Sequence, residues 1–167
     1  QKYFKSNPCI VGETVITATQ QGLMTCYRQS DGHVVWQKQL PGEMFSSPRY
    51  YKGRLVFGCI DTKFYCLDAA TGDEIWSYQT GQMIGSTGVV TSSGKIIFPA
   101  HDKFIYTLDI MTGKVKQKNE LGFRSTGSPV MALGAMYFVM TGNKFGCFDL
   151  IERNLRWTRN ASGDHQH

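Results

Sequence analysis

The sequence predicts an all-β fold built from four four-stranded antiparallel blades of a β-propeller. Two internal repeats lead to this prediction. The segment 66–76 is echoed by segments 26–36, 107–117 and 147–157, whose last residues are 40, 41 and 40 positions apart. A second marker keeps the same step and consists of Pro8, Ser47-Pro48, Thr87-Gly88 and Ser128-Pro129. A fixed period of this length is typical of units that bury their apolar faces by stacking on copies of themselves.

Turn residues divide each repeat into four short runs of strand length. In the second repeat the runs cover residues 46–51, 54–60, 63–69 and 74–79. Loops of two to four residues force consecutive strands to lie antiparallel and adjacent, so each repeat is expected to be a four-stranded meander. We expect one propeller region over residues 1–167, with repeats at about 6–42, 43–82, 83–123 and 124–163.

The second strand of each repeat is apolar without alternation, as residues 55–57, 96–98 and 136–140 show. A sheet with one face in water would alternate between apolar and polar residues. These strands therefore need cover on both faces, which a blade receives when it packs between two other blades. No window shows the three-and-four spacing of an amphipathic helix, so a helical solenoid is excluded.

The repeated segment also predicts how neighbouring blades are joined. Asp68 can accept hydrogen bonds from the turn that follows it, and Gly72 supplies the positive φ that the turn needs. Trp76 then lies on the outermost strand, where its large ring can be buried against the next blade. By this reasoning the docking positions are Trp36, Trp76, Trp157, Asp68, Asp109, Asp149, Gly32, Gly72 and Gly113.

Charge and composition exclude several classes of function. The net charge is +5, but the 18 basic residues are scattered singly, so no nucleic-acid partner is expected. No run approaches the roughly 20 apolar residues of a membrane span. The five cysteines form no CxxC pair, which favours small buried thiols over a disulfide framework. A reduced, cytoplasmic setting is the expectation, with a periplasmic or secreted one left open.

The pattern small-x-Asp-x-x-x-Gly-x-x-x-Trp, preceded by a Ser-Pro strand, resembles the tryptophan-docking repeat of quinoprotein-like (PQQ-like) β-propellers. The resemblance covers essentially the whole chain, and the second repeat matches it except for Cys66 in place of the common alanine. The other repeats depart from it at Arg28 for Asp, Gln117 for Trp and Arg153 for Gly. The resemblance implies that the motif is architectural. Because of the departures at Gln117 and Arg153, tight docking of the third and fourth blades does not follow from the motif.

Two wider contexts contain similar repeats. Residues 40–48, 58–68 and 101–106 are similar to the C-terminal propeller of aminoadipate-semialdehyde-dehydrogenase-like acyl-CoA synthetases of animals. The same repeat builds the lipoprotein propeller of the bacterial outer-membrane assembly machinery, which binds proteins. These resemblances imply either an accessory region of a larger adenylate-forming enzyme or an assembly scaffold.

A binding scaffold is the function that the sequence favours, and a quinone (PQQ)-dependent dehydrogenase is the alternative. By resemblance, such an enzyme needs calcium, a catalytic aspartate and often a disulfide between adjacent cysteines. No adjacent cysteines and no calcium-like acid cluster occur, and a hydrolase lacks a carboxylate pair or Ser/His/Asp set. We therefore predict no catalytic residue, metal or cofactor. Aromatic or basic residues at turns mark a candidate partner surface of Arg49, Tyr50, Lys52, Phe123 and Arg124.

The number of repeats bears on how the ring closes. Quinoprotein-like rings have seven or eight blades, so four repeats are expected to form an open half of an about eight-bladed ring rather than a closed four-bladed disc. The first and last blades would then expose apolar faces that bury themselves against a protein. Two partners are left open: a second copy that completes the ring, and further blades outside this sequence.

Overall fold

The computed structural model describes residues 3–160, so positions 161–163 of the fourth predicted repeat lie outside the described residues. Sixteen strands and no helix are found in that part of the chain, and the strands form four separate four-stranded sheets. We call these sheets blades 1 to 4 in chain order. All neighbouring strands within a blade are antiparallel and follow one another in sequence, so each blade is a meander.

The strands have the following bounds. Blade 1 contains β1 (Cys9–Val11), β2 (Thr14–Ala18), β3 (Leu23–Arg28) and β4 (Val34–Gln39). Blade 2 contains β5 (Arg49–Tyr51), β6 (Arg54–Gly58), β7 (Lys63–Asp68) and β8 (Glu74–Gln79). Blade 3 contains β9 (Val89–Val90), β10 (Lys95–Pro99), β11 (Phe104–Asp109) and β12 (Val115–Glu120). Blade 4 contains β13 (Val130–Ala132), β14 (Ala135–Met140), β15 (Lys144–Asp149) and β16 (Asn154–Asn160).

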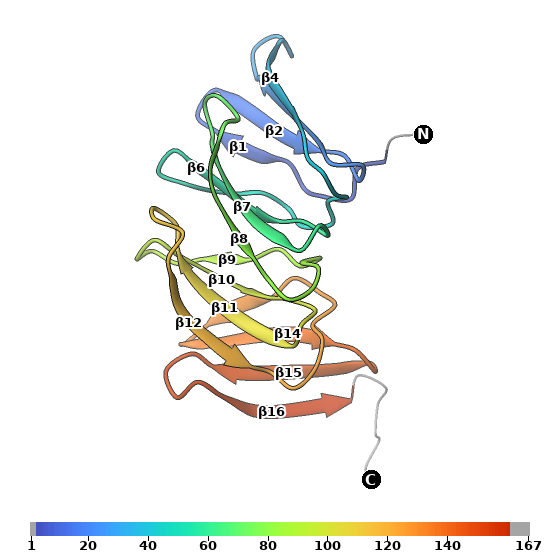
Figure 1. Ribbon diagram of the computed structural model, residues 1–167, viewed down its shortest axis with the longest axis vertical. Coiled ribbons are helices and arrows are strands. Elements are labelled where there is room, and N and C mark those ends of the chain that lie inside the picture. The colour runs from blue at the N-terminus through green and yellow to red at the C-terminus, as the bar shows by residue number, and fades with distance from the viewer. Residues whose placement is uncertain (1–2, 161–167) are drawn as a thin grey trace.

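The four blades are stacked along the longest axis of the molecule, from blade 1 at one end to blade 4 at the other (Figure 1). The stack does not close on itself, so the outer faces of blades 1 and 4 are free. Strands β1, β5 and β9 lie side by side, which places the first strands of blades 1 to 3 on one side of the stack. The predicted all-β fold of four propeller blades in an open arrangement is confirmed.

The first strand of blade 2 is shorter than the sequence predicts. A strand was expected from residue 46, but β5 begins at Arg49. Pro48 has no N–H to give to a ladder. The two serines before it use their polar groups elsewhere, because Ser46 Oγ lies 2.6 Å from the Gly58 carbonyl oxygen and the Ser47 N–H donates to Thr87 of the next blade.

A ladder of hydroxyl groups joins the blades at this position. The Asn7 N–H donates to Ser47 Oγ at 2.9 Å, the Ser47 N–H to Thr87 Oγ1 at 2.7 Å, and the Thr87 N–H to Ser128 Oγ at 3.1 Å. Each hydroxyl therefore satisfies a backbone donor of the preceding blade. The Ser/Thr-Pro/Gly marker of the sequence is thus a connection between blades as well as the start of a strand.

Three apolar clusters fill the spaces between successive blades. The densest aromatic packing lies between blades 2 and 3, where the rings of Phe64 and Phe98 stack with centroids 4.0 Å apart. Both faces of β6 and β10 contribute to these clusters, because each blade is covered on both sides. The unalternating apolar runs therefore have the physical cause that the sequence predicted.

Candidate functional site

Trp36 and Trp76 hold successive blades together in the same way. The Nε1–H of Trp36 donates to the Ala69 carbonyl oxygen at 3.2 Å, and that of Trp76 to the Ile110 carbonyl oxygen at 2.9 Å. Each indole also lies flat against a glycine turn of the next blade. A Cβ on Gly72 would lie 2.7 Å from Trp36 Cε3, and one on Gly113 would lie 2.7 Å from Trp76 Cδ2.

Local geometry directs these indoles outwards from their own blade. Each tryptophan pairs across the sheet with a cysteine, Trp36 with Cys26 and Trp76 with Cys66, and the register shifts by one residue directly after the pair. A bulge of this kind re-aims the side chains beside it. The small thiol leaves room for the indole, which explains why the repeat carries cysteine or threonine at this position. Burial raises the pKa of the Cys66 thiol to about 12.

The aspartates of the repeat shape the turns that receive the indoles. Asp68 Oδ1 accepts from the Ala70 N–H at 2.8 Å, and Asp109 Oδ1 accepts from the N–H and hydroxyl of Thr112 at 3.0 Å. The hydrogen bonds from Thr112 hold the pKa of Asp109 below its usual value. Gly32, Gly72 and Gly113 follow with φ of 72°, 79° and 70°, in the left-handed region that only glycine adopts without strain.

Blade 1 makes its turn without the usual aspartate. Arg28 stands in that place, and Asp31 takes over the role by accepting from the His33 N–H at 2.9 Å and from Arg28 Nη1 at 2.8 Å. The backbone hydrogen bond from His33 is the main reason that the pKa of Asp31 is lowered. The turn therefore keeps its shape and its glycine, Gly32, although the motif is altered.

The two remaining departures from the repeat belong to one interface. The tryptophan of one blade docks on the glycine turn of the next, so Gln117 of blade 3 and Arg153 of blade 4 are the paired positions. Arg153 adopts φ of 59°, in the region that favours glycine. Blade 4 keeps the aspartate turn, because Asp149 Oδ1 accepts from the N–H groups of Ile151 and Glu152 at 2.7 and 2.8 Å. It adds an ion pair in which Asp149 Oδ2 accepts from Arg156 Nε at 2.7 Å. The backbone N–H of Glu152, with Arg156, lowers the pKa of Asp149.

Introducing a tryptophan at position 117 together with a glycine at position 153 should stabilise the chain by more than the sum of the two single substitutions. Gln117→Trp alone meets a side chain where its indole should lie, and Arg153→Gly alone only relieves the positive φ, worth about 1 kcal/mol. Together they should add about 1.5–3 kcal/mol from burial of the ring. Urea unfolding of the two single variants and the double variant measures this. Strict additivity would show that the two positions do not face each other.

The open face of blade 4 carries an aromatic cluster. The rings of Tyr137, Phe145 and Trp157 have centroids 5.9–6.3 Å apart. Strand register makes these residues and Cys147 the equivalents of Val56, Phe64, Trp76 and Cys66, which pack onto blade 3. Trp157 is 36% exposed, and no acceptor for its Nε1–H is found within residues 3–160. Blade 4 therefore presents a docking face that has no blade on it.

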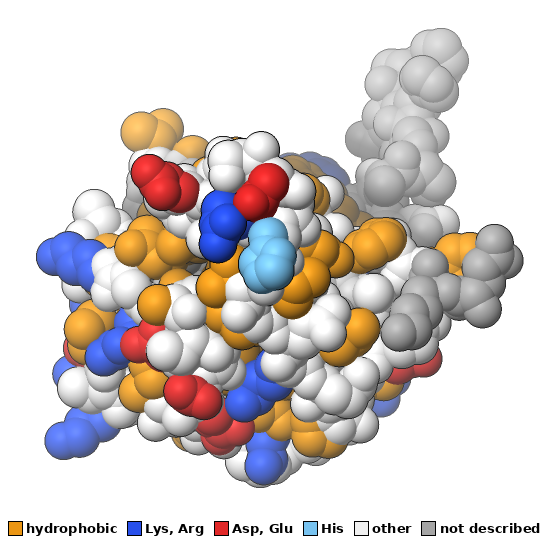
Figure 2. All heavy atoms as spheres, turned by 90° about the horizontal axis from the view of Figure 1, so that it is seen from above, with side chains coloured by type: hydrophobic (Ala, Val, Ile, Leu, Met, Phe, Trp, Pro, Cys, Tyr) orange, Lys and Arg blue, Asp and Glu red, His pale blue; other side chains and the backbone are white. Residues whose placement is uncertain are grey.

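The open face of blade 1 is different in character. Thr17, Thr25 and Gln29 occupy the positions at which blade 2 places Phe57, Tyr65 and Ala69. Figure 2, which views the molecule from the blade 1 end, shows polar atoms between separate hydrophobic patches, with acidic and basic groups interspersed. Apolar side chains are exposed in blade 1 as well, with Ile10 at 70% and Val34 at 42% exposure, so both ends of the stack expose apolar groups, but at blade 1 these are mixed with polar ones. A polar outer face is typical of terminal repeats, and blade 1 has this character only in part.

Gly32 nevertheless keeps the geometry of an indole-receiving turn. A Cβ placed on it would meet no atom within 4 Å, whereas one on Gly72 or Gly113 would strike a tryptophan. The two ends of the stack are therefore complementary in one respect. Blade 4 has a tryptophan without a glycine turn, and blade 1 has a glycine turn without a tryptophan.

The predicted partner-surface residues do not form one surface. Arg49 lines a shallow hollow with Val89 and Val130, whereas Tyr50 lines a different cleft between blades 1 and 2. Lys52 lies in a turn with its Nζ 5.4 Å from the centroid of the Tyr51 ring.

The other two residues of that set lie before blade 4. Phe123 is half-buried and stacks on Phe138 with centroids 5.6 Å apart, so it belongs to the packing between blades 3 and 4. Arg124 is exposed. Burial lowers the pKa of His101, and the positive charge of Arg124 adds to that effect.

The remaining recurrent acids have structural partners. Asp61 Oδ2 accepts from the Tyr65 hydroxyl at 2.5 Å, and Asp102 Oδ2 accepts from the Tyr106 hydroxyl at 2.6 Å and from the Gly81 N–H at 2.8 Å. Burial, with these carboxylates, raises the pKa of both tyrosines. Within residues 3–160 no group of three or more His, Cys, Asp or Glu is placed to hold a metal ion, and no helix could cross a membrane.

Comparisons with known proteins agree with this geometry. A BamB from Nitrosomonas eutropha, an outer membrane protein assembly factor, is 25% identical over 90% of this chain and 40% of its own length. The beta-alanine-activating enzyme of Mus musculus is 32% identical over 71 residues, which cover 42% of this chain and 6% of that protein. This chain thus spans well under half of either relative.

Solved structures show the same fold. BamB from Moraxella catarrhalis superposes with a TM-score of 0.78 at 19% identity, over 92% of this chain and 50% of its own. Quinohemoprotein alcohol dehydrogenase from Comamonas testosteroni superposes with a TM-score of 0.77 at 16% identity, over 96% of this chain and 36% of its own. The profile of the PQQ_2 family, described as outer membrane protein assembly factor BamB, matches residues 4–167. The chain therefore belongs to this family of PQQ-like repeat propellers.

Proposed function

We propose that the chain is a non-catalytic scaffold that binds protein through the open face of blade 4. The observation that carries this proposal is the exposed indole of Trp157, whose counterparts Trp36 and Trp76 each dock on a neighbouring blade. A contiguous exposed aromatic cluster of this kind is typical of a protein interface. The relatives that are named outer membrane protein assembly factors support a scaffold role for the fold.

The recurrent acids support the non-catalytic part of the proposal. Both carboxylate oxygens of Asp61, Asp102 and Asp149 accept hydrogen bonds, from tyrosine hydroxyls, turn amides and Arg156. A general base needs a free oxygen within reach of a substrate proton. These carboxylates instead serve the turns that position the blades.

The partner that fits blade 4 is the blade 1 end of a second copy. Trp157 needs a glycine turn with open space above it, and Gly32 offers one. A head-to-tail contact repeated twice closes into a ring with two-fold symmetry. The chain superposes on 50% of the solved Moraxella BamB, so two copies would supply as many residues as one chain of that protein. The polar residues Thr17 and Gln29 on that face should keep the association weak.

Light scattering coupled to size exclusion, over a range of protein concentrations, tests this proposal. We expect the mass to rise from the 18.8 kDa of one chain towards twice that value as the concentration increases. Trp157→Ala should weaken the association at least about tenfold, which corresponds to about 1.4 kcal/mol. Leu133→Ser is the matched control, because Leu133 is 96% exposed in the turn between β13 and β14 and takes no part in the ring contacts of the aromatic cluster.

Either of two results would overturn the proposal. One is a mass that stays at that of a single chain at every concentration, which would remove the second copy as the partner. The other is equal weakening by Trp157→Ala and Leu133→Ser, which would place the contact elsewhere.

The similarity of 71 residues to a beta-alanine-activating enzyme supports one biological setting, an accessory region of a larger adenylate-forming enzyme. The sequence of the full gene tests that setting directly.

A further inference from the structure

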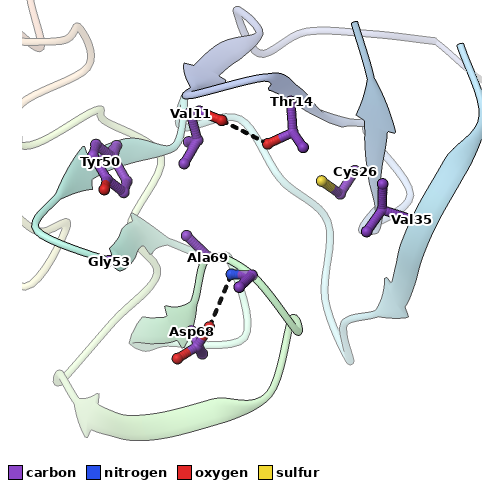
Figure 3. Close-up of a pocket in the computed structure, with 9 residues that line it drawn as sticks. Val11, Thr14, Cys26, Val35, Tyr50, Gly53, Asp68 and Ala69 are labelled. Atoms are coloured by element: carbon purple, nitrogen blue, oxygen red, sulfur yellow. Dashed lines mark hydrogen bonds between the residues drawn. The ribbon is translucent and has the colours of Figure 1, made fainter. Parts of the chain in front are cut away.

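Two hollows lie at the contacts between blades, and they differ in charge. The cleft between blades 1 and 2 has a volume of about 470 Å³ and mainly apolar walls, which include Val11 and Val35. Asp68 is among the residues that line it, but Figure 3 shows the Asp68 carboxylate turned away from the wall that blade 1 makes. No charged side chain among the lining residues therefore faces into this cleft.

A second hollow, of about 450 Å³, lies between blade 4 and the segment that links it to blade 3. Phe123 of the linking segment and Met140 and Leu155 of blade 4 give it apolar walls. Lys144 lines it as well. Lys144 is exposed, and within residues 3–160 its ammonium group has no ion-pair partner. The hollow thus combines apolar surface with an unpaired positive charge.

Blades 2 and 3 fill the equivalent space with an aromatic ring and a carboxylate. Tyr106 pairs with Phe98 across the sheet, and the two rings stack with centroids 5.5 Å apart. The Tyr106 hydroxyl donates to Asp102 Oδ2 at 2.6 Å. Tyr65 and Asp61 form the same pair in blade 2, at 2.5 Å. The chain itself therefore shows that this part of a blade accommodates a ring beside a carboxylate.

Blade 4 lacks both groups and has a cation in their place. Gly146 stands at the position of Tyr106, and Gly142 stands at that of Asp102. Lys144 stands where blade 3 has a phenylalanine. The hollow therefore exists because glycines replace a tyrosine and an aspartate, and its charge is opposite to that of the missing carboxylate.

Two other side chains fill the space only in part. A Cβ on Gly146 would lie 2.9 Å from Met140 Cε, so the methionine covers the glycine. Phe123 stacks on Phe138 with centroids 5.6 Å apart. The space beside these side chains and Lys144 stays open. Pockets of this volume, with apolar walls and a few polar groups, are typical of small-ligand sites.

We propose that this hollow binds a small aromatic carboxylate, whose ring packs beside Phe123 and Met140 and whose carboxylate accepts from the Lys144 ammonium group. The ligand supplies the two groups that Tyr106 and Asp102 supply in blade 3. An ion pair with one exposed lysine is weak by itself, so burial of the ring against the apolar walls provides most of the affinity.

The hollow and the exposed aromatic cluster lie on opposite faces of blade 4. Side chains alternate between the two faces along a strand, and Lys144 directly precedes Phe145 of the cluster on β15. A ligand in the hollow therefore does not compete with the contact of blade 4 with a second copy, and the two proposals can fail separately.

Benzoate is the probe that tests the proposal, because it combines an aromatic ring with a carboxylate. Titration of the whole chain, followed by two-dimensional ¹H–¹⁵N NMR, should give saturable shifts at the amides of Gly122, Thr141 and Thr158, which line the hollow. Neutral benzamide should bind about threefold to fivefold more weakly at low salt, because it lacks the charge. Equal affinities for benzoate and benzamide would overturn the role of Lys144.

The choice of an aromatic ligand has its own comparison. Cyclohexanecarboxylate has the same charge but no aromatic ring, so it cannot stack on Phe123. It should bind more weakly than benzoate, since an aromatic pair contributes about 0.5–1.5 kcal/mol beyond the area that it buries. Equal affinities for these two acids would overturn the preference for an aromatic ring.

Two variants change the hollow itself. Lys144→Met removes the charge and keeps the length of the side chain, so it should weaken benzoate binding about threefold to fivefold. Thr158→Trp places a bulky ring at the edge of the hollow and should weaken binding at least about tenfold. Lys63→Met should leave binding unchanged, because Lys63 holds the position of Lys144 in blade 2, where the tyrosine and the aspartate are present.

The outcomes distinguish the hollow from other binding places. Weaker binding in Lys144→Met and in Thr158→Trp, with normal binding in Lys63→Met, is the expected result. Undiminished binding in a folded Thr158→Trp variant, or equal weakening by the two lysine substitutions, would overturn the proposal. The absence of saturable shifts in the unmodified chain would overturn it as well. Far-ultraviolet circular dichroism verifies that each variant keeps its sheets.

Discussion

Replacing Trp76 by alanine is expected to lower the free energy of unfolding by about 3–5 kcal/mol. The indole packs against Gly113, stacks on Phe64 with centroids 6.5 Å apart, and donates its Nε1–H to the Ile110 carbonyl oxygen. Its removal opens a cavity between blades 2 and 3 and leaves that buried carbonyl without its donor. Equilibrium unfolding in urea, followed by circular dichroism, gives the change directly.

Trp157→Ala provides the matched control for this measurement. Trp157 has the same strand position and the same cysteine partner across the sheet, but its blade has no neighbour on that side. At concentrations where the chain is a single copy, the loss should be below about 1 kcal/mol, as for most exposed substitutions. A similar loss in both variants would mean that the indole stabilises its own blade rather than the interface.

Gly113→Ala is expected to lower the free energy of unfolding by about 2–5 kcal/mol. A left-handed residue with a Cβ costs about 1–2 kcal/mol by itself. The rest comes from the Trp76 indole, since the added Cβ would lie 2.7 Å from Cδ2 and the ring would have to move. Overpacking of this kind typically costs another 1–3 kcal/mol. The urea midpoint of the variant, with the slope unchanged, reports the loss.

Gly32→Ala isolates the backbone part of that cost. Gly32 has almost the same φ, 72° against 70°, and a Cβ on it would meet no atom within 4 Å. We expect only the loss from the left-handed backbone, about 1–2 kcal/mol. If Gly113→Ala and Gly32→Ala lowered the free energy of unfolding equally, the close approach of the indole to the turn would make no contribution to stability.

The fold could be predicted from the sequence because its signals are local and occur four times. The Asp68 turn, the positive φ of Gly72 and the short loops each depend on residues a few positions apart. The pattern of turns and short loops is a weak signal in any one repeat, but it recurs in all four repeats, so recognising one meander predicts the other three. Even the unalternating apolar strands indicate their own environment, because only a blade with neighbours on both sides can bury both faces.

The contacts between blades could be predicted less well, because they join residues that are far apart in the chain. The Ser/Thr hydroxyl ladder was visible as a marker, yet its donors and acceptors lie 40 or 41 residues apart. That Gln117 and Arg153 belong to one interface follows only once the direction of docking is known.

A double-mutant cycle of Trp76→Ala and Gly113→Ala tests most directly whether the blades are held together by an indole seated on a glycine turn. Once the indole is gone, alanine at position 113 should cost no more than alanine at position 32. The double variant should therefore be more stable than the sum of the two single losses implies, by at least about 1 kcal/mol. Two losses that simply add would contradict this account of how the blades dock.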